Sequence, residues 1–178
     1  VGLAGTVMRF VPVLAALTSG ISHFDGDLHA RKRPMKALID SLKKLQISID
    51  DQGLATLPFS IASDGVVQGG SIEIDASESS QFISALMLVG ARFVNGLSIK
   101  HVGKKLPSLP HIKMTIDMLK QVDVEVKEIG ENYWKINPGI IKSKNWVIEP
   151  DLSNAGPFLA SAMITHGEIN IKIGRAHV

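Results

Sequence analysis

The sequence predicts an α/β fold of repeated βαβαββ units, with the helices inside and the sheets outside. Short alternating apolar segments and longer segments with helical spacing follow one another in the same order twice, and this order begins a third time. The polar residues that open the corresponding helices, Thr6, Ser80 and Asn154, follow one another at intervals of 74 residues. Pro34 and Pro110 mark the second helix of each unit. Because one unit cannot bury the apolar faces of its own helices, we expect neighbouring units to share a core.

The first unit contains two expected helices and four expected strands. Gly5 and Thr6 open the first helix, and we expect Gly20 to end it. The segment from Met35 to Leu45 has apolar residues on one face and charged residues on the other, which is typical of a helix at the surface of a core. Alternating or apolar runs bounded by turn residues predict strands at residues 21–24, 47–49, 59–62 and 71–74.

The second unit repeats this order, and a third begins after it. A helix is expected from Ser79–Ser80 to about Phe93, and another follows Pro110. Strands are expected at residues 97–100, 122–126, 133–136 and 146–148. A further helix contains Phe158 and Met163, and a strand is expected at residues 169–171.

The composition indicates a folded protein without membrane spans. Of the 178 residues, 45% are hydrophobic and 20% charged, which is enough for a real core and argues against disorder. The net charge of +2 is too small to indicate nucleic-acid binding. No apolar run approaches the roughly 18 residues of a membrane span. Without cysteine, disulfides and thiolate metal sites are excluded. We expect a cytoplasmic location, no metal and no cofactor.

The two ends of the chain lead to expectations about its organisation. The chain starts at Val1 in a turn ahead of a helix, so we expect a piece of a longer protein, truncated at both ends. Glu149-Pro150-Asp151 suits a crossing segment, which predicts one domain over residues 1–150 and the start of another over residues 151–178. Residues 173–178 equal the translation of a common sequencing adapter, and our hypothesis is that they are non-native read-through.

The most informative polar cluster lies between an expected strand and an expected helix. Ser77, Ser79, Ser80 and Gln81 crowd into this junction. The first turn of a helix has unpaired N–H groups and a dipole that favours negative charge, so these side chains suit a phosphorylated, hydroxyl-rich ligand. The alternative is simple N-capping, for which serine is a preferred residue.

Two other clusters have both a functional and an ordinary interpretation. Gly5 and its neighbours allow close approach of a ligand to a helix terminus, although a tight turn has the same composition. The guanidinium groups of Arg31 and Arg33 suit carboxylate or phosphate, although such a cluster is usually a solvated charge run. His29, His101 and His111 are not spaced as a metal set, and we expect each to be a surface or loop histidine.

Together these clusters resemble a known family, EPSP synthase (3-phosphoshikimate 1-carboxyvinyltransferase), over Val1 to about Lys172. Ala4–Arg9 is similar to its Ala-Gly-Thr-x-x-Arg motif, and Arg33-Pro34 to the end of its basic loop. Residues 79–82 read Ser-Ser-Gln-Phe, as in the family, and Ser108 and Pro110 fit its later Ser-x-Pro. The Phe-Asp-Gly-Asp form of residues 24–27 resembles the actinobacterial branch.

The resemblance implies the enolpyruvyl transferase fold and the transfer of enolpyruvyl from phosphoenolpyruvate to shikimate 3-phosphate, a step of aromatic amino-acid and chorismate biosynthesis. It implies that Gly5, Arg33 and Gln81 bind phosphoenolpyruvate and that Ser79, Ser80, Gln81 and Ser108 bind shikimate 3-phosphate. The family's catalytic acid and base lie outside the matched stretch, so we expect no catalytic residue here and an inactive fragment. A monomer is implied for the full-length protein.

Two alternatives stay open at this point. UDP-N-acetylglucosamine enolpyruvyl transferase shares the fold, and its cysteine loop would lie outside this stretch, but the Ser-Ser-Gln-Phe sequence argues against it. A non-catalytic protein or an RNA 3′-phosphate cyclase could use the same repeat. A protein that reads nucleic acid should show a basic stripe with stacking aromatics, whereas this chain shows one basic loop.

Overall fold

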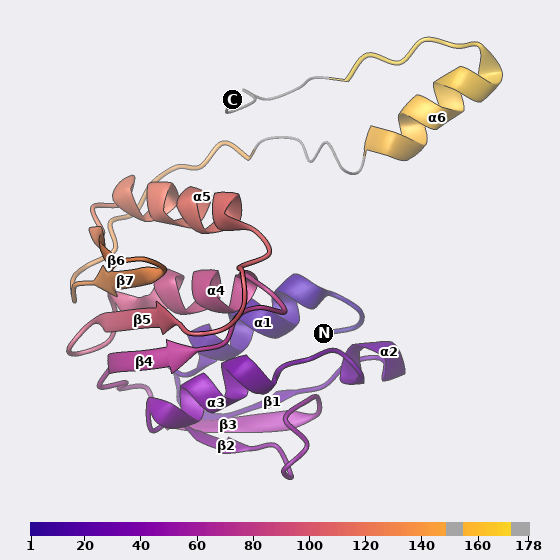
Figure 1. Ribbon diagram of the computed structural model, residues 1–178. Coiled ribbons are helices and arrows are strands. Elements are labelled where there is room, and N and C mark those ends of the chain that lie inside the picture. The colour runs from indigo at the N-terminus through magenta and orange to yellow at the C-terminus, as the bar shows by residue number, and fades with distance from the viewer. Residues whose placement is uncertain (149–154, 172–178) are drawn as a thin grey trace. The chain divides into compact units, whose positions relative to one another are not determined.

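The computed structural model describes residues 1–148 and 155–171 (Figure 1). The chain separates into two compact parts, Val1–Ser143 and Lys144–Val178. The larger part contains the elements of both repeats and every residue of the candidate site, so it is described first. The expected boundary at residues 149–151 and the expected read-through at residues 173–178 lie outside the described residues.

The first repeat forms a three-stranded antiparallel sheet with helices against it. Its elements are α1 (Gly5–Ala15), β1 (Ser19–Phe24), α2 (Leu28–Arg31), α3 (Lys36–Lys44), β2 (Ser48–Asp50) and β3 (Phe59–Asp64). The strand order is β1-β3-β2, with Phe24 opposite Phe59 and Ile49 opposite Ile61. The rings of Phe24 and Phe59 stack with their centroids 5.1 Å apart, which helps fix this register.

The second repeat forms a four-stranded mixed sheet. Its elements are β4 (Gly70–Ile74), α4 (Gln81–Gly90), β5 (Leu97–His101), α5 (Leu109–Lys120), β6 (Val126–Gly130) and β7 (Tyr133–Ile136). The order is β4-β5-β7-β6, with β4 parallel to β5 and the other pairs antiparallel. By order and pairing, β1, β2 and β3 correspond to β5, β6 and β7, so the internal repeat predicted from the sequence is present in the structure.

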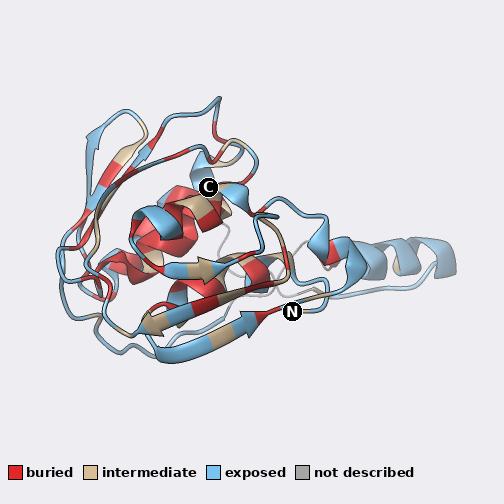
Figure 2. Ribbon diagram, turned by 90° about the horizontal axis from the view of Figure 1, so that it is seen from below, coloured by how far each residue is buried: buried red, intermediate tan, exposed pale blue. Residues whose placement is uncertain are grey.

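The helices lie inside and the sheets outside, as predicted. Eight of the ten residues of α4 are buried, whereas β4 and β5 alternate between buried and more exposed residues. Figure 2 shows the buried residues gathered on the enclosed helices. The largest fully buried side chains come from both repeats and include Met8, Leu38, Phe82 and Leu86. The two repeats therefore share one apolar core.

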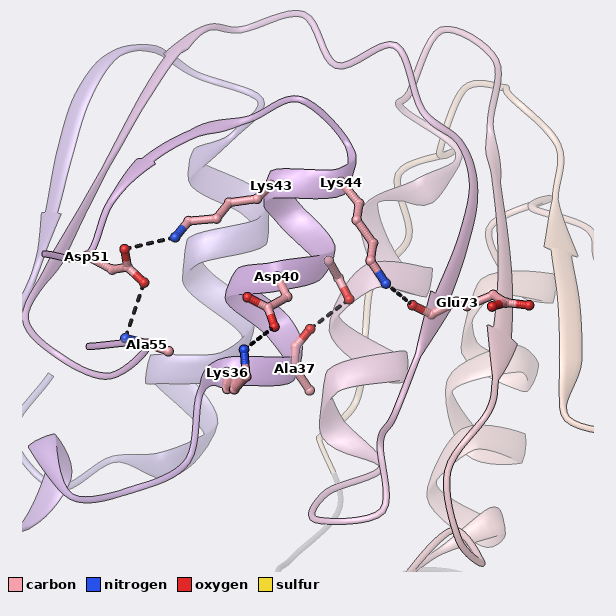
Figure 3. Close-up of polar contacts among 9 residues, drawn as sticks. Lys36, Ala37, Asp40, Lys43, Lys44, Asp51, Ala55 and Glu73 are labelled. Carbon is pink, nitrogen blue, oxygen red and sulfur yellow. Dashed lines mark hydrogen bonds and ion pairs between the residues drawn. The ribbon is translucent and has the colours of Figure 1, made fainter. Parts of the chain in front are cut away.

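Polar contacts of α3 connect the repeats and hold a difficult loop (Figure 3). Lys44 Nζ donates to the Glu73 carbonyl of β4 at 2.8 Å. Lys43 Nζ lies 2.8 Å from Asp51 Oδ1, and the same carboxylate accepts from the Gly53 and Ala55 N–H groups. Gly53 and Ala55 both have positive φ. Asp51 therefore stabilises a loop whose positive φ angles are otherwise unfavourable.

The smaller part contains α6 (Gly156–Thr165), the helix expected around Phe158 and Met163. His166 ends it in the left-handed conformation. The strands expected at residues 146–148 and 169–171 are wrong, because both described segments are irregular. Val147 is 92% exposed and Ile148 85% exposed. An apolar run forms a strand only where another strand pairs with it, and neither segment has one among the described residues.

Three other expectations differ from the structure. The strand expected at residues 122–126 begins only at Val126, because Asp123 has φ of 61° and interrupts the extended backbone. The first helix ends at Ala15, and Gly20 instead lies within β1. The basic loop contains the short helix α2. In the described ranges, no helix is long and apolar enough to cross a membrane.

Candidate anion-binding site

The N-terminal ends of α1, α4 and α5 meet on one side of the larger part. Both α4 and α5 return from the carboxyl end of a strand to the start of a parallel strand, so the two helices run in the same direction. The buried Thr115 Oγ1 donates to Ser84 Oγ at 2.9 Å and joins them side by side. Gln81, the first residue of α4, contacts Thr6, the second residue of α1. Three positive helix ends therefore point to the same region.

The serines at these ends do not act as ordinary helix caps. Ser80 is the N-cap of α4 and Ser108 the N-cap of α5, and neither makes a side-chain capping hydrogen bond. Ser79 Oγ accepts from the Gln81 N–H at 3.3 Å, a local turn contact. Ser79 and Ser80 are 9% and 4% exposed. This contact engages only the Ser79 hydroxyl, so the hydroxyls of Ser80 and Ser108 keep capacity for a ligand.

Gln81 joins α4 to α1 through Arg9. The Arg9 Nη1 group donates to Gln81 Oε1 at 2.8 Å, and Gln81 Nε2 donates to Thr6 Oγ1 at 3.5 Å. The Arg9 guanidinium also lies over the Phe82 ring, 5.4 Å from its centroid. These contacts fix the Gln81 amide between two helices, so its orientation is set before any ligand arrives.

Arg9 has hydrogen-bonding capacity that the described residues do not use. Its Nε atom is buried without a hydrogen-bond partner there. Burial and the neighbouring Arg33 cation lower the pKa of Arg9, and Glu78 acts in the opposite direction. Both lowering causes disfavour the charged form, so an anion beside Arg9 would be bound more tightly than at a solvated arginine.

Arg33 lies directly against Gly5. A Cβ atom on Gly5 would overlap Arg33 Nη1 and would come within 4.0 Å of Arg9 Nη1. The missing side chain of Gly5 therefore lets the Arg33 guanidinium approach the first turn of α1 in this position. Among the residues that the structure describes, neither Arg9 nor Arg33 forms an ion pair with a carboxylate. Two cations beside a helix N-terminus form an anion-binding arrangement.

A search of protein-family models finds that the EPSP synthase model, 3-phosphoshikimate 1-carboxyvinyltransferase, matches residues 1–177. The chain belongs to the EPSP synthase family. It is 49% identical over 170 residues to a 3-phosphoshikimate 1-carboxyvinyltransferase of Mycobacterium ulcerans (strain Agy99), with 96% of this chain and 39% of that protein covered.

Two solved structures of EPSP synthase from Acinetobacter baumannii share the fold of this family member. Each is 26% identical with a TM-score of 0.70, and they cover 92% and 90% of this chain. The chain corresponds to 35% of each solved chain. It thus spans little more than a third of the relatives it matches.

The structure brings most of the predicted EPSP synthase residues together. Gly5, Arg33 and Gln81 meet around the first turn of α1 through the contacts described above. The three predicted serines lie at the ends of the two neighbouring helices. Cavities of about 750 and 470 Å³ include none of these residues, but Asp75 and Glu78 of the loop before Ser80 line the smaller one.

Two residues of the region were not assigned a role from the sequence. The sequence places Arg9 in a motif, but its contact with Gln81 spans 72 positions and no local pattern predicts it. The expectation that His101 is a surface or loop residue is wrong, because its side chain is 8% exposed at the end of β5. Leu97, Ile99 and His101 occupy alternate positions of one strand, and this alternation is the sequence signal that could have indicated the burial of His101.

Proposed function

We propose that this chain forms part of a 3-phosphoshikimate 1-carboxyvinyltransferase, which transfers enolpyruvyl from phosphoenolpyruvate to shikimate 3-phosphate and releases phosphate. Residues 1–150 belong to the domain that binds substrate, and residues 151–178 begin the other domain. The proposal includes a cytoplasmic location and a monomeric full-length protein. Its strongest support is the position of two guanidinium groups, neither in an ion pair among the described residues, beside helix N-termini whose serine N-caps make no side-chain capping bond.

In this proposal, phosphoenolpyruvate binds on the α1 side of the site. Arg33 holds its carboxylate or phosphate through paired N–H donors, and Gly5 allows that approach. The Gln81 amide, fixed by Arg9, contacts both substrates. Ser79, Ser80 and Ser108 donate to the hydroxyl and phosphate groups of shikimate 3-phosphate. These residues bind and orient, and the acid–base steps belong to residues outside this chain.

The test is a titration of the ¹⁵N-labelled chain followed by amide chemical shifts. Shikimate 3-phosphate is expected to shift the amides near Ser79, Ser80 and Ser108, with half-saturation near a millimolar, which corresponds to about −4 kcal/mol. Inorganic phosphate and UDP-N-acetylglucosamine at equal concentration are the controls and should shift fewer of them. Equal shifts from all three ligands, or shifts far from these serines, would refute the proposal and return the serines to a structural role.

A further inference from the structure

His101 connects the two loops that carry the serines of the candidate site. It ends β5 directly beside Ile74, the last residue of the parallel strand β4. Its Nδ1 atom accepts a hydrogen bond from the Ala76 N–H at 3.2 Å, and its Nε2 atom lies 2.5 Å from the Lys104 carbonyl oxygen. Ala76 lies in the loop to α4, and Lys104 lies in the loop to α5. One buried imidazole therefore bridges both loops.

These two contacts require one protonation state of the ring. A backbone N–H can only donate, so the Nδ1 atom that faces Ala76 must carry a lone pair. A carbonyl oxygen can only accept, so the Nε2 atom that faces Lys104 must carry the proton. The neutral Nε2–H tautomer satisfies both contacts. The Nδ1–H tautomer satisfies neither, and the imidazolium loses the Ala76 contact.

The Ala76 contact extends along the backbone to the serines. The Ser79 N–H donates to the Ala76 carbonyl at 3.1 Å, and the Gln81 N–H donates to Ser79 Oγ at 3.3 Å. Ala76 is fully buried. Fixing Ala76 therefore fixes the turn that presents Ser79 and Ser80.

The two loops are also packed closely beside the histidine. Ser77 Oγ donates to Asp75 Oδ1 at 2.5 Å, and it lies 3.4 Å from the Lys104 carbonyl oxygen. A Cβ atom on Gly103 would overlap both Asp75 and Ser77. On the α5 side, Leu106 is 5% exposed and anchors the segment that leads to Ser108. The imidazole thus lies inside a tightly packed junction whose far ends are the helix N-termini.

We propose that His101 is a positioning residue: its neutral Nε2–H tautomer holds the Ala76 and Lys104 loops together, so that Ser79, Ser80 and Ser108 face one ligand. The identity of that ligand, shikimate 3-phosphate, rests on the proposed function. The loop connection itself rests on the hydrogen bonds of the ring. Phosphoenolpyruvate contacts on Gly5 and Arg33 lie beyond the two loops and do not depend on His101.

The tautomer is tested on the unmodified chain by long-range ¹H–¹⁵N spectra of the imidazole rings. His101 is expected to show a protonated Nε2 and an unprotonated Nδ1. His23, an exposed histidine on β1, is the internal comparison and should show the averaged nitrogens of a solvated ring. An Nδ1–H form of His101, or averaged nitrogens like those of His23, would overturn the inference.

The positioning effect is tested with His101→Leu, His101→Asn and the control His23→Leu. His101→Leu removes both contacts and is expected to weaken shikimate 3-phosphate binding about fivefold, the effect of one ordinary hydrogen bond, with phosphoenolpyruvate shifts near Gly5 unchanged. His101→Asn keeps an acceptor near Ala76 and should recover part of the affinity. Gly103→Ala, which retains the imidazole but separates the loops, should also weaken binding of shikimate 3-phosphate.

Amide hydrogen exchange separates this inference from the proposed function. Exchange at Ala76 and Ser79 should accelerate in His101→Leu and not in His23→Leu. If the unmodified chain does not respond to shikimate 3-phosphate, the proposed function fails, whereas accelerated exchange still supports the loop connection. Unchanged exchange at Ala76 in both His101 variants, or equal losses for both substrates, would overturn the positioning role.

Discussion

Gln81→Glu is the substitution that tests the charge arrangement of the site most directly. Glutamate has almost the shape of glutamine, and it would place a carboxylate oxygen where Gln81 Oε1 now accepts from Arg9 Nη1 at 2.8 Å. Two unit charges 4 Å apart attract by about 1 kcal/mol in water and by about 4 kcal/mol at an effective dielectric constant of 20. Arg9 is partly buried, so desolvation offsets much of the attraction. We expect a net stabilisation of about 1 kcal/mol, which raises the Tm by about 3 °C.

The same substitution should weaken the binding of anions. The new carboxylate would neutralise Arg9 and lie near Arg33, so phosphoenolpyruvate would approach one net positive charge less. A loss of about 1.4 kcal/mol of attraction corresponds to a tenfold weaker affinity. Gln81→Ala instead leaves Arg9 Nη1 without its acceptor, which costs about 1–2 kcal/mol and lowers the Tm by about 3–6 °C. The two variants therefore differ in the sign of the stability change and agree in the sign of the affinity change.

Thermal unfolding followed by circular dichroism measures the stability, and amide shifts on addition of phosphoenolpyruvate measure the affinity. Gln68→Glu is the matched control, because Gln68 is exposed in the segment between β3 and β4. It adds the same charge and should change neither property beyond a small electrostatic effect. If Gln81→Glu bound phosphoenolpyruvate as well as the unmodified chain, the ligand would not meet the two arginines. A lower Tm for Gln81→Glu would refute the assumed Arg9 contact.

The remaining predictions concern the glycine, the loop carboxylate and turnover. Gly5→Ala should displace the flexible end of Arg33, so it should weaken the binding of phosphoenolpyruvate in the same titration with little change in Tm. If the variant bound phosphoenolpyruvate as tightly as the unmodified chain, the ligand would lie elsewhere. The Lys43 contact and the Gly53 N–H hold the pKa of Asp51 below its ordinary value of 3.8, so its stabilisation is present above that value and is lost as the pH falls through the folded pKa. Asp51→Asn should therefore lower the Tm at pH 7 and make the Tm fall less steeply as the pH is lowered. Asp27→Asn, which removes an exposed charge, is the control and should do neither. If the Tm of Asp51→Asn fell with pH in parallel with that of the unmodified chain, this role of Asp51 would be excluded. Because the proposed function assigns the acid and base to residues outside this chain, the chain should release no phosphate above background in a coupled assay, and turnover lost in Gln81→Ala would overturn that expectation.

The helices and most strands of the two repeats could be predicted from the sequence because their signals are local. Apolar residues recur about every 3.6 positions in a helix and every 2 positions in a strand when one face of the element packs on the core. The failures arise where the deciding partner is distant. Trp146-Val147-Ile148 has the composition of a strand, but the described residues offer no strand to pair with it. The alternation from Val122 to Val126 does predict burial, whereas the left-handed Asp123 prevents an extended backbone.

The candidate site divides in the same way between local and distant information. The serines could be found because they crowd into one strand-to-helix junction. Arg9 and His101 gain their roles from contacts with Gln81 and Ala76, and such contacts depend on how the repeats pack. Alternation along β5 predicts that His101 is buried, but it does not identify the two backbone partners of the ring. Long-range hydrogen bonding is therefore the part of this site that periodicity could not predict.

The two arginines of the basic loop have different partners. Asp25 directly follows β1, and His101 ends β5, the corresponding strand of the second repeat. Each folds back the loop after its strand. Asp25 does so by accepting from Arg31 Nε at 2.9 Å and Arg31 Nη2 at 2.7 Å, an exposed pair whose geometry is bidentate.

The two arginines therefore have different contacts. Arg31 is engaged by Asp25 and shapes the loop, whereas Arg33, two residues later, reaches Gly5. Both residues are exposed, as in a solvated charge run, but each also has a defined neighbour. In the second repeat His101 contacts the Ala76 N–H and the Lys104 carbonyl in place of such an ion pair, and the loop it contacts leads to a serine instead of a cation. The two loops thus contribute a guanidinium from one repeat and a hydroxyl from the next, the combination that a ligand with both anionic and hydroxyl groups requires.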